Sequence, residues 1–114
     1  MHEMAVTQQI LSLALAEAGK VGASAITRIN LKVGEWSTFE PTCLEFYFGI
    51  LARDTAAADA KLAIETVPVT YSCGDCGERY QPTGVAVLCP KCCSTHTGLV
   101  SGREIYLDSI EVEK

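Results

Sequence analysis

Four cysteines in the second half of the chain constrain its fold more than any other feature. Cys73 and Cys76 form one C-x-x-C pair, Cys89 and Cys92 form another, and twelve residues separate the two pairs. Each pair places two sulfurs on one tight turn, so the two turns can face each other across a tetrahedral S₄ metal site. Zinc is the usual occupant of such a site. Because thiolates fill all four positions, we expect a structural and not a catalytic metal.

The cysteines allow two other interpretations. Disulfides would require an oxidising compartment, but the N-terminus has no basic stretch followed by an apolar core, so the sequence favours a cytoplasmic protein with free thiols. Iron in a rubredoxin-like site would use the same four ligands. The sequence therefore predicts a metal site with zinc as its default occupant, and it leaves iron open.

Length and charge limit the classes of function. A chain of 114 residues suits one small domain with a metal-stapled satellite, and no apolar run approaches the ~18 residues of a membrane span. The formal net charge of −5 becomes about −7 with a zinc tetrathiolate. Between residues 73 and 92 only Arg79 and Lys91 are basic, against Asp75 and Glu78. We therefore expect neither a nucleic-acid partner nor a membrane.

The first half of the chain shows helix and strand periodicities. Apolar residues at helical spacing predict a helix from Glu3 to about Lys20. Strict alternation of apolar and polar residues predicts a half-buried strand over residues 25–33. Pro41 fits the first turn of a second helix, which is expected to run to about Thr55.

The remaining extended segments flank the cysteines. Residues 61–71 predict a strand in which Pro68 requires an edge position or a bulge. Residues 103–113 are extended too, but their apolar positions change parity between Leu107 and Ile110, which predicts a bulge. We expect this last strand to return to the first half of the chain, so that the cysteine module is an insertion between two strands of one sheet.

The N-terminus has an unusual capacity to chelate metal. Because His2 is bulky, we expect Met1 to be retained, so that a free α-amine precedes His2. The amine, the deprotonated His2 amide and His2 Nδ1 can close two fused chelate rings in one plane, an arrangement that suits Ni(II) or Cu(II) better than zinc. A histidine at position 2 is by itself more often part of a frayed terminus.

Motifs spread over nearly the whole chain resemble those of the HypA/HybF family. They are Met-His-Glu at residues 1–3, Val33-Gly34-Glu35, the two C-x-x-C pairs, Ser101-Gly102-Arg103-Glu104 and Ser109-Ile110-Glu111-Val112. The resemblance implies a nickel metallochaperone for [NiFe]-hydrogenase maturation. It also implies an α+β fold, with a small mixed three-stranded sheet packed with two helices and an inserted zinc-ribbon-like domain. The expected domains are a discontinuous nickel-binding domain, residues 1–71 and 99–114, and a zinc-binding domain, residues 72–98.

The same resemblance implies roles for individual residues. The nickel ligands would be His2 with the Met1 amine, supported by Glu3 and Glu40, and His96 is a conditional candidate. Structural zinc would be held by Cys73, Cys76, Cys89 and Cys92. The implied partners are a HypB-like maturation GTPase and the [NiFe]-hydrogenase large-subunit precursor, and the implied state is a monomer or weak homodimer.

Two further cysteines lie outside the predicted metal site. The family more often has glycine at the position of Cys93. Cysteine in place of glycine raises the cost of a left-handed turn there. Cys43 is expected to be a small buried hydrophobe in the second helix.

The sequence shows no catalytic motif. No histidine stands at a recognisable spacing from a serine or cysteine nucleophile, which favours a carrier over an enzyme. The alternative function is a zinc-ribbon adaptor that binds a partner and carries no nickel.

Overall fold

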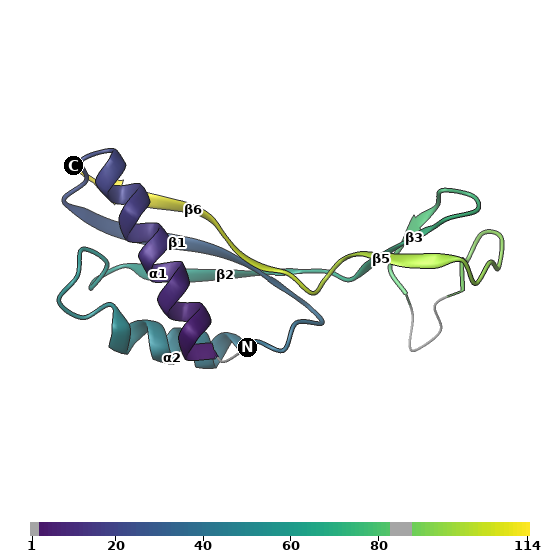
Figure 1. The fold of residues 1–114 in the computed structure, drawn as a ribbon, viewed down its shortest axis with the longest axis horizontal. Coiled ribbons are helices and arrows are strands. Elements are labelled where there is room, and N and C mark those ends of the chain that lie inside the picture. Colours follow the sequence, from purple (N-terminus) through teal and green to yellow (C-terminus); the bar gives the residue numbers. More distant parts are fainter. Residues whose placement is uncertain (1–2, 83–87) are drawn as a thin grey trace.

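The chain folds into an elongated molecule with two sheets arranged end to end (Figure 1). The structure, a computed structural model, describes residues 3–82 and 88–114. Its extents are 54 × 26 × 18 Å. The first sheet has the strand order β2-β1-β6, and the second has the order β4-β3-β5.

Helix α1 (Glu3–Lys20) confirms the first predicted helix. Its buried face contains Val6, Ile10, Leu11, Ala14 and Ala18. The Thr7 hydroxyl is also buried and donates a hydrogen bond of 2.7 Å to the Glu3 carbonyl oxygen. This contact ties the first turn of the helix together directly behind the N-terminus.

The first sheet joins strands from both halves of the chain. Strand β1 (Ala25–Gly34) lies in the centre, parallel to β2 (Lys61–Val67) and antiparallel to β6 (Ile105–Glu113). The register moves between Asn30, which pairs with Ser109, and Leu31, which pairs with Leu107. Asp108 is the extra residue of this bulge, so the predicted parity change and the return of the last strand are both confirmed.

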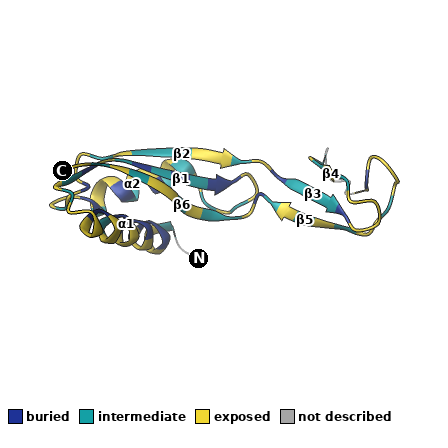
Figure 2. Ribbon diagram, turned by 90° about the horizontal axis from the view of Figure 1, so that it is seen from above, coloured by how far each residue is buried: buried dark blue, intermediate teal, exposed yellow. Residues whose placement is uncertain are grey.

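Both helices cover the same face of this sheet, and its other face is open (Figure 2). Between the two layers lie Ile29 and Leu31 of β1 and Leu44 of α2 (Pro41–Leu51), all at most 2% exposed. Burial of each such side chain contributes about 1.5–3 kcal/mol. The mixed sheet with two helices is the α+β fold expected from the sequence.

Helix α2 ends earlier than predicted, at Leu51 and not near Thr55. Asp54 has a φ of 63°, in the left-handed region. The Ala52 carbonyl oxygen accepts hydrogen bonds from the Thr55 hydroxyl at 2.7 Å and from the Thr55 N–H at 3.2 Å. Side-chain hydrogen bonds of this kind favour turns over helix continuation. The spacing of apolar residues does not predict them, so it could not predict where the helix ends.

The predicted strand over residues 61–71 is interrupted at Pro68. Strand β2 ends at Val67, and β3 (Thr70–Cys73) belongs to the second sheet, where it pairs antiparallel with β4 (Arg79–Tyr80) and β5 (Thr97–Ser101). Strand β2 is an edge of the first sheet, which agrees with the edge position expected for a strand next to this proline. The cysteine module is therefore inserted between β2 and β6.

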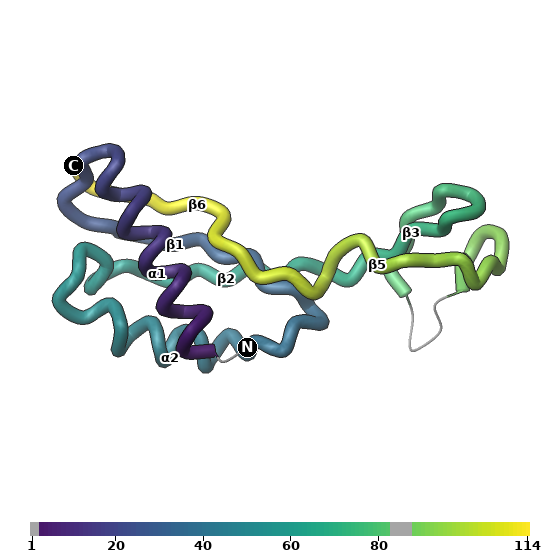
Figure 3. Tube along the Cα trace, in the orientation of Figure 1, coloured from purple at the N-terminus to yellow at the C-terminus, as the bar shows by residue number. Residues whose placement is uncertain are grey.

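Two chain segments cross between the sheets and lie side by side (Figure 3). One contains Pro68, whose carbonyl oxygen accepts a hydrogen bond of 3.0 Å from the Ser101 hydroxyl in the other. The turn after β1 holds both, because Glu35 Oε1 accepts the Val69 N–H at 3.0 Å and the Trp36 N–H donates to the Gly102 carbonyl oxygen at 2.7 Å. We call this contact region, residues 34–36, 68–69 and 101–104, the junction.

The junction requires glycine at its closest approach. A Cβ atom at Gly34 would lie 2.3 Å from the Gly102 carbonyl oxygen, a separation that real Cβ atoms do not show. The two motifs that stood out in the sequence, Val33-Gly34-Glu35 and Ser101-Gly102-Arg103-Glu104, meet at this point.

Among the described helices, none is long and apolar enough to cross a membrane.

Candidate metal centre

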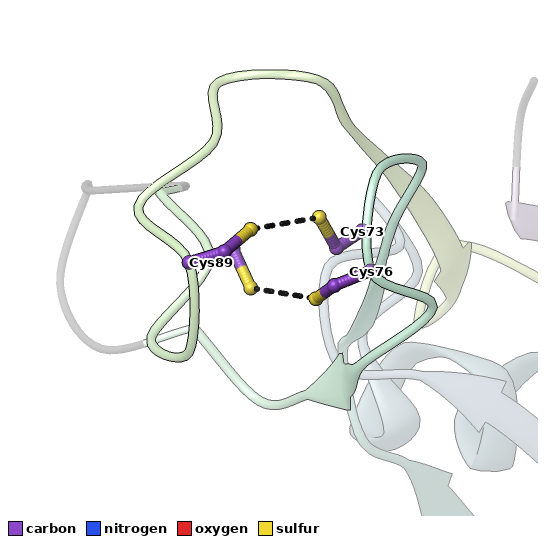
Figure 4. A group of neighbouring side chains, drawn as sticks. Cys73, Cys76 and Cys89 are labelled. Atoms are coloured by element: carbon purple, nitrogen blue, oxygen red, sulfur yellow. Dashed lines mark hydrogen bonds between the residues drawn. The ribbon is translucent and has the colours of Figure 1, made fainter.

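The four cysteines of the two C-x-x-C pairs come together at the far end of the second sheet. Their Sγ atoms all lie within 4.8 Å of one another, and Figure 4 shows Cys73 and Cys76 turned toward the second cysteine turn, which carries Cys89. We call Cys73, Cys76, Cys89 and Cys92 the cysteine cluster. Cys73 and Cys89 are buried, whereas Cys76 and Cys92 are exposed.

The spacing of the sulfurs fits one tetrahedral ion. A Zn–S bond of about 2.3 Å places neighbouring sulfurs of a tetrahedron about 3.8 Å apart. The separations are 3.6 Å for Cys73 Sγ to Cys92 Sγ and 3.6 Å for Cys76 Sγ to Cys89 Sγ. Both are far longer than the ~2.05 Å of a disulfide, and all six cysteines of the chain are free. The cluster can therefore hold one metal ion between its two turns.

Backbone donors support negative charge on the cluster. The Cys76 and Asp75 N–H groups lower the pKa of Cys73 to about 6, although burial acts in the opposite direction. For Cys92, the Ser94 N–H lowers the pKa, but the hydrogen bond with Cys73 and burial outweigh it and raise the pKa to about 12. One thiolate therefore forms readily, and its negative charge opposes the formation of a second thiolate beside it. A bound dication would neutralise this charge and allow the other thiols to ionise.

A polar group lies against the first cysteine turn. Asp75 Oδ1 is 3.3 Å from His96 Nδ1, and Asp75 Oδ2 accepts a short hydrogen bond from the Ser94 hydroxyl. The His96 carbonyl oxygen accepts the Gly74 N–H at 2.7 Å. Asp75 and Ser94 were not singled out in the sequence, where only their positions beside the cysteines could have pointed to them. His96 is 78% exposed in its side chain, and its ring bonds to Asp75 next to the cluster.

The structure describes two of the four residues expected to hold nickel, Glu3 and Glu40. Met1 and His2 fall outside the described residues. Glu3 begins α1, and Glu40 is the exposed N-cap of α2, where its side chain makes no capping hydrogen bond. Val6 and Phe39 line one groove, so the first turns of α1 and the entry to α2 are neighbours. The nickel ligand set stays a prediction.

The two remaining cysteines differ from each other in environment. Cys43 is half-buried in α2, less buried than the sequence suggested. Cys93 is exposed and directly follows the cluster. Its φ is 61°, in the left-handed region, so the turn that favours glycine is present although the glycine is not.

These features define a class of protein: a small α+β fold of two helices on a mixed sheet, with an inserted zinc-ribbon-like module that carries a four-cysteine metal site. The family described as "Hydrogenase/urease nickel incorporation, metallochaperone, hypA" matches residues 1–112. The chain belongs to this HypA family, whose members are nickel metallochaperones for hydrogenase maturation.

Individual relatives agree with the family match over nearly their full length. The hydrogenase maturation factor HypA of Dehalococcoides mccartyi is 34% identical over 113 residues, which is 99% of this chain and 95% of the relative. That of Chlorobium limicola is 37% identical over 114 residues, 100% of this chain and 98% of the relative. The solution structure of the Ni metallochaperone HypA from Helicobacter pylori is similar with a TM-score of 0.73 and 28% identity, covering 99% of this chain and 98% of the other.

Proposed function

We propose that this chain binds Ni(II) at its N-terminus and delivers it for [NiFe]-hydrogenase maturation, with zinc held structurally by the cysteine cluster. The observation that carries the proposal is the family match over residues 1–112, which includes the Met-His-Glu start. In this role nickel is the cargo and the protein is a carrier, so no covalent chemistry is required of it. We place this work in the cytoplasm, where thiolates stay reduced.

The nickel site we propose consists of His2, the Met1 amine and the carboxylates of Glu3 and Glu40. The amine, the His2 amide and the His2 imidazole supply three nitrogens in fused chelate rings, which suits the planar preference of Ni(II). Two structural facts support this placement. The Thr7 hydroxyl fixes the first turn of α1, and the Glu40 side chain is exposed and not used as a cap.

The zinc site we propose uses the four thiolates of the cysteine cluster. Their separations match a tetrahedral ion, and their donor set suits zinc, which when bound would tie the two cysteine turns together. All four coordination positions would be filled, so no position stays open for water or substrate. The second sheet, which has short strands and few buried apolar residues, depends on such a staple for its stability.

The partners we propose are a maturation GTPase and the hydrogenase large-subunit precursor. Membership of a family that works in hydrogenase maturation supports them. A carrier must release its ion, and a terminal site with an exposed supporting carboxylate is accessible to a receiving protein.

The experiment that tests the nickel site compares two histidine variants of untagged protein. His2→Ala should abolish high-affinity nickel binding in a competition titration and leave zinc content and circular dichroism unchanged. His96→Ala, which removes the only other histidine of the chain, is the matched control and should keep nickel affinity. An N-terminal extension should act like His2→Ala, because it converts the Met1 amine into an amide. Unchanged nickel affinity in both the His2→Ala and the extended protein would refute the terminal site.

A further inference from the structure

Strand β6 is an open edge of the first sheet. In the described parts of the chain it pairs only with β1. The carbonyl oxygens of Glu111 and Glu113 accept hydrogen bonds from the β1 side, at 3.1 and 2.8 Å. Because backbone groups alternate in direction along an antiparallel strand, those of Ile110 and Val112 face away from the sheet. These groups are available to a further strand.

An apolar groove runs along this edge, between α1 and β6. Its volume is about 630 Å³. Ile10 and Leu13 of α1 form part of one wall, and Ile105, Leu107 and Ile110 of β6 form part of the other. Leu13 is 57% exposed and lies beside other apolar residues, so the groove has an exposed apolar wall. The groove, which we call the edge groove, therefore lies beside the part of β6 that ends at Ile110, a residue whose backbone groups face away from the sheet.

The charges of the edge decide which kind of segment fits it. Strand β6 carries Asp108, Glu111 and Glu113 and no basic residue. Glu111 lies 3.7 Å from Arg28, an exposed pair of little energetic weight. Asp108 attracts Lys32 of β1 without forming a close ion pair, and Glu113 makes no ion pair within the described residues. Two copies of β6 placed side by side would bring six carboxylates together, which opposes self-association. A strand with Lys or Arg would instead gain favourable cross-strand pairs.

We propose that the edge groove binds an extended segment of a partner protein in which apolar residues alternate with Lys or Arg. The segment pairs with β6 as a fourth strand of the first sheet. Its apolar side chains enter the groove beside α1, and its basic side chains lie on the open face of the sheet, opposite Asp108, Glu111 and Glu113. Recognition by strand addition needs no metal, so this inference is independent of the nickel and zinc sites.

Synthetic peptides test the proposal on the full-length protein. The probe is a nine-residue peptide that alternates valine and lysine, and the comparisons are a valine–glutamate peptide and a peptide of the first composition in block order. The alternating lysine peptide should bind at least tenfold more tightly than either comparison. It should also slow hydrogen exchange of the Ile110 and Val112 amides.

Matched variants separate the edge groove from general charge attraction. Leu13→Asp places a charge in the groove wall and should weaken binding at least tenfold. Val21→Asp makes a similar change at a residue that is 49% exposed and does not line the groove, and it should leave binding unchanged. Equal binding of the block peptide, or equal affinity in the Leu13→Asp protein, would overturn the proposal. So would concentration-dependent protection of the same amides without peptide, because the occupant would then be a second copy of the chain.

Discussion

Cys93 occupies in the second cysteine turn the position that Gly77 occupies in the first. Both residues have left-handed backbones, with φ of 61° at Cys93 and 79° at Gly77. Each donates its N–H to the carbonyl oxygen of the first cysteine of its own turn, Cys93 to Cys89 at 2.8 Å and Gly77 to Cys73 at 3.0 Å. The two halves of the metal site are thus built alike, but only the first has the residue that suits its conformation.

Cys93→Gly is expected to stabilise the zinc-loaded protein. A left-handed conformation costs a non-glycine residue about 1–2 kcal/mol. Glycine has more conformational freedom in the unfolded state, which reduces the gain in unfolding free energy by roughly 0.5–1 kcal/mol. The net gain is then up to about 1.5 kcal/mol, to be measured by urea unfolding at saturating zinc. Gly77→Cys is the matched control and should destabilise the protein. A less stable Cys93→Gly protein would show that the Cys93 side chain contributes something beyond strain.

Cys73→Ser is expected to remove most of the zinc, which we propose at about one ion per chain. The variant loses the thiol whose pKa the backbone donors lower to about 6, and a serine hydroxyl is a poor zinc ligand. Metal analysis after nickel-free purification measures the loss, and limited proteolysis should show new cleavage in residues 74–96. Cys43→Ser, outside the cluster, should keep full zinc content. Full zinc content and an unchanged cleavage pattern in Cys73→Ser would contradict the site.

Gly34→Ala is expected to destabilise the protein by about 1–3 kcal/mol, the usual cost of overpacking. The added methyl group would lie 2.3 Å from a backbone oxygen of Gly102, which no side-chain rotation can relieve. Gly49→Ala is the control, because nothing lies within 4 Å of its added methyl group in α2. That variant should gain up to about 1 kcal/mol from helix propensity. Urea unfolding compares the two, and equal stabilities would argue against the close approach.

Glu104 is expected to make part of the stability of the junction depend on pH. Its own N–H and that of Gly102, which donates to Glu104 Oε1 at 2.6 Å, lower the pKa of the carboxyl below its ordinary value of 4.5. A lowered folded-state pKa stabilises the fold above pH 4.5, and this contribution disappears as the pH falls through the folded pKa.

The test follows the difference in unfolding free energy between the natural protein and Glu104→Gln. The difference should be constant near neutral pH and should shrink as the pH falls below 4.5. Acid also protonates the cysteine cluster, but this affects both proteins equally. A difference that does not change with pH would mean that the carboxylate charge has no role in the junction.

Zinc removal is expected to weaken nickel binding in protein that stays folded. The cysteine module is joined to β2 and β6 of the first sheet, and the junction holds both crossing segments against the turn after β1. A change in the geometry of the cysteine turns should therefore alter the first sheet. Nickel titrations with and without zinc measure the coupling, and equal affinities would exclude it.

Local sequence signals determined much of this protein. The cysteine spacing indicated one four-sulfur site, the alternation over residues 25–33 indicated β1, and the parity change before Ile110 indicated the bulge at Asp108. Each of these depends on the direction of neighbouring side chains, which a single segment encodes through its own periodicity. The donors at residues 1–3 suited Ni(II) or Cu(II), and the resemblance that spans the chain then pointed to nickel.

Tertiary structure alone decided the rest. Periodicity indicates which face of a strand is buried, but the neighbour of that strand depends on packing between residues far apart in the chain. The parallel pairing of β1 with β2, the open edge at β6 and the contact between Gly34 and Gly102 arise in this way. The left-handed turn at Cys93 is similar, because the four sulfurs must converge on one point and the backbone takes whatever conformation that convergence requires.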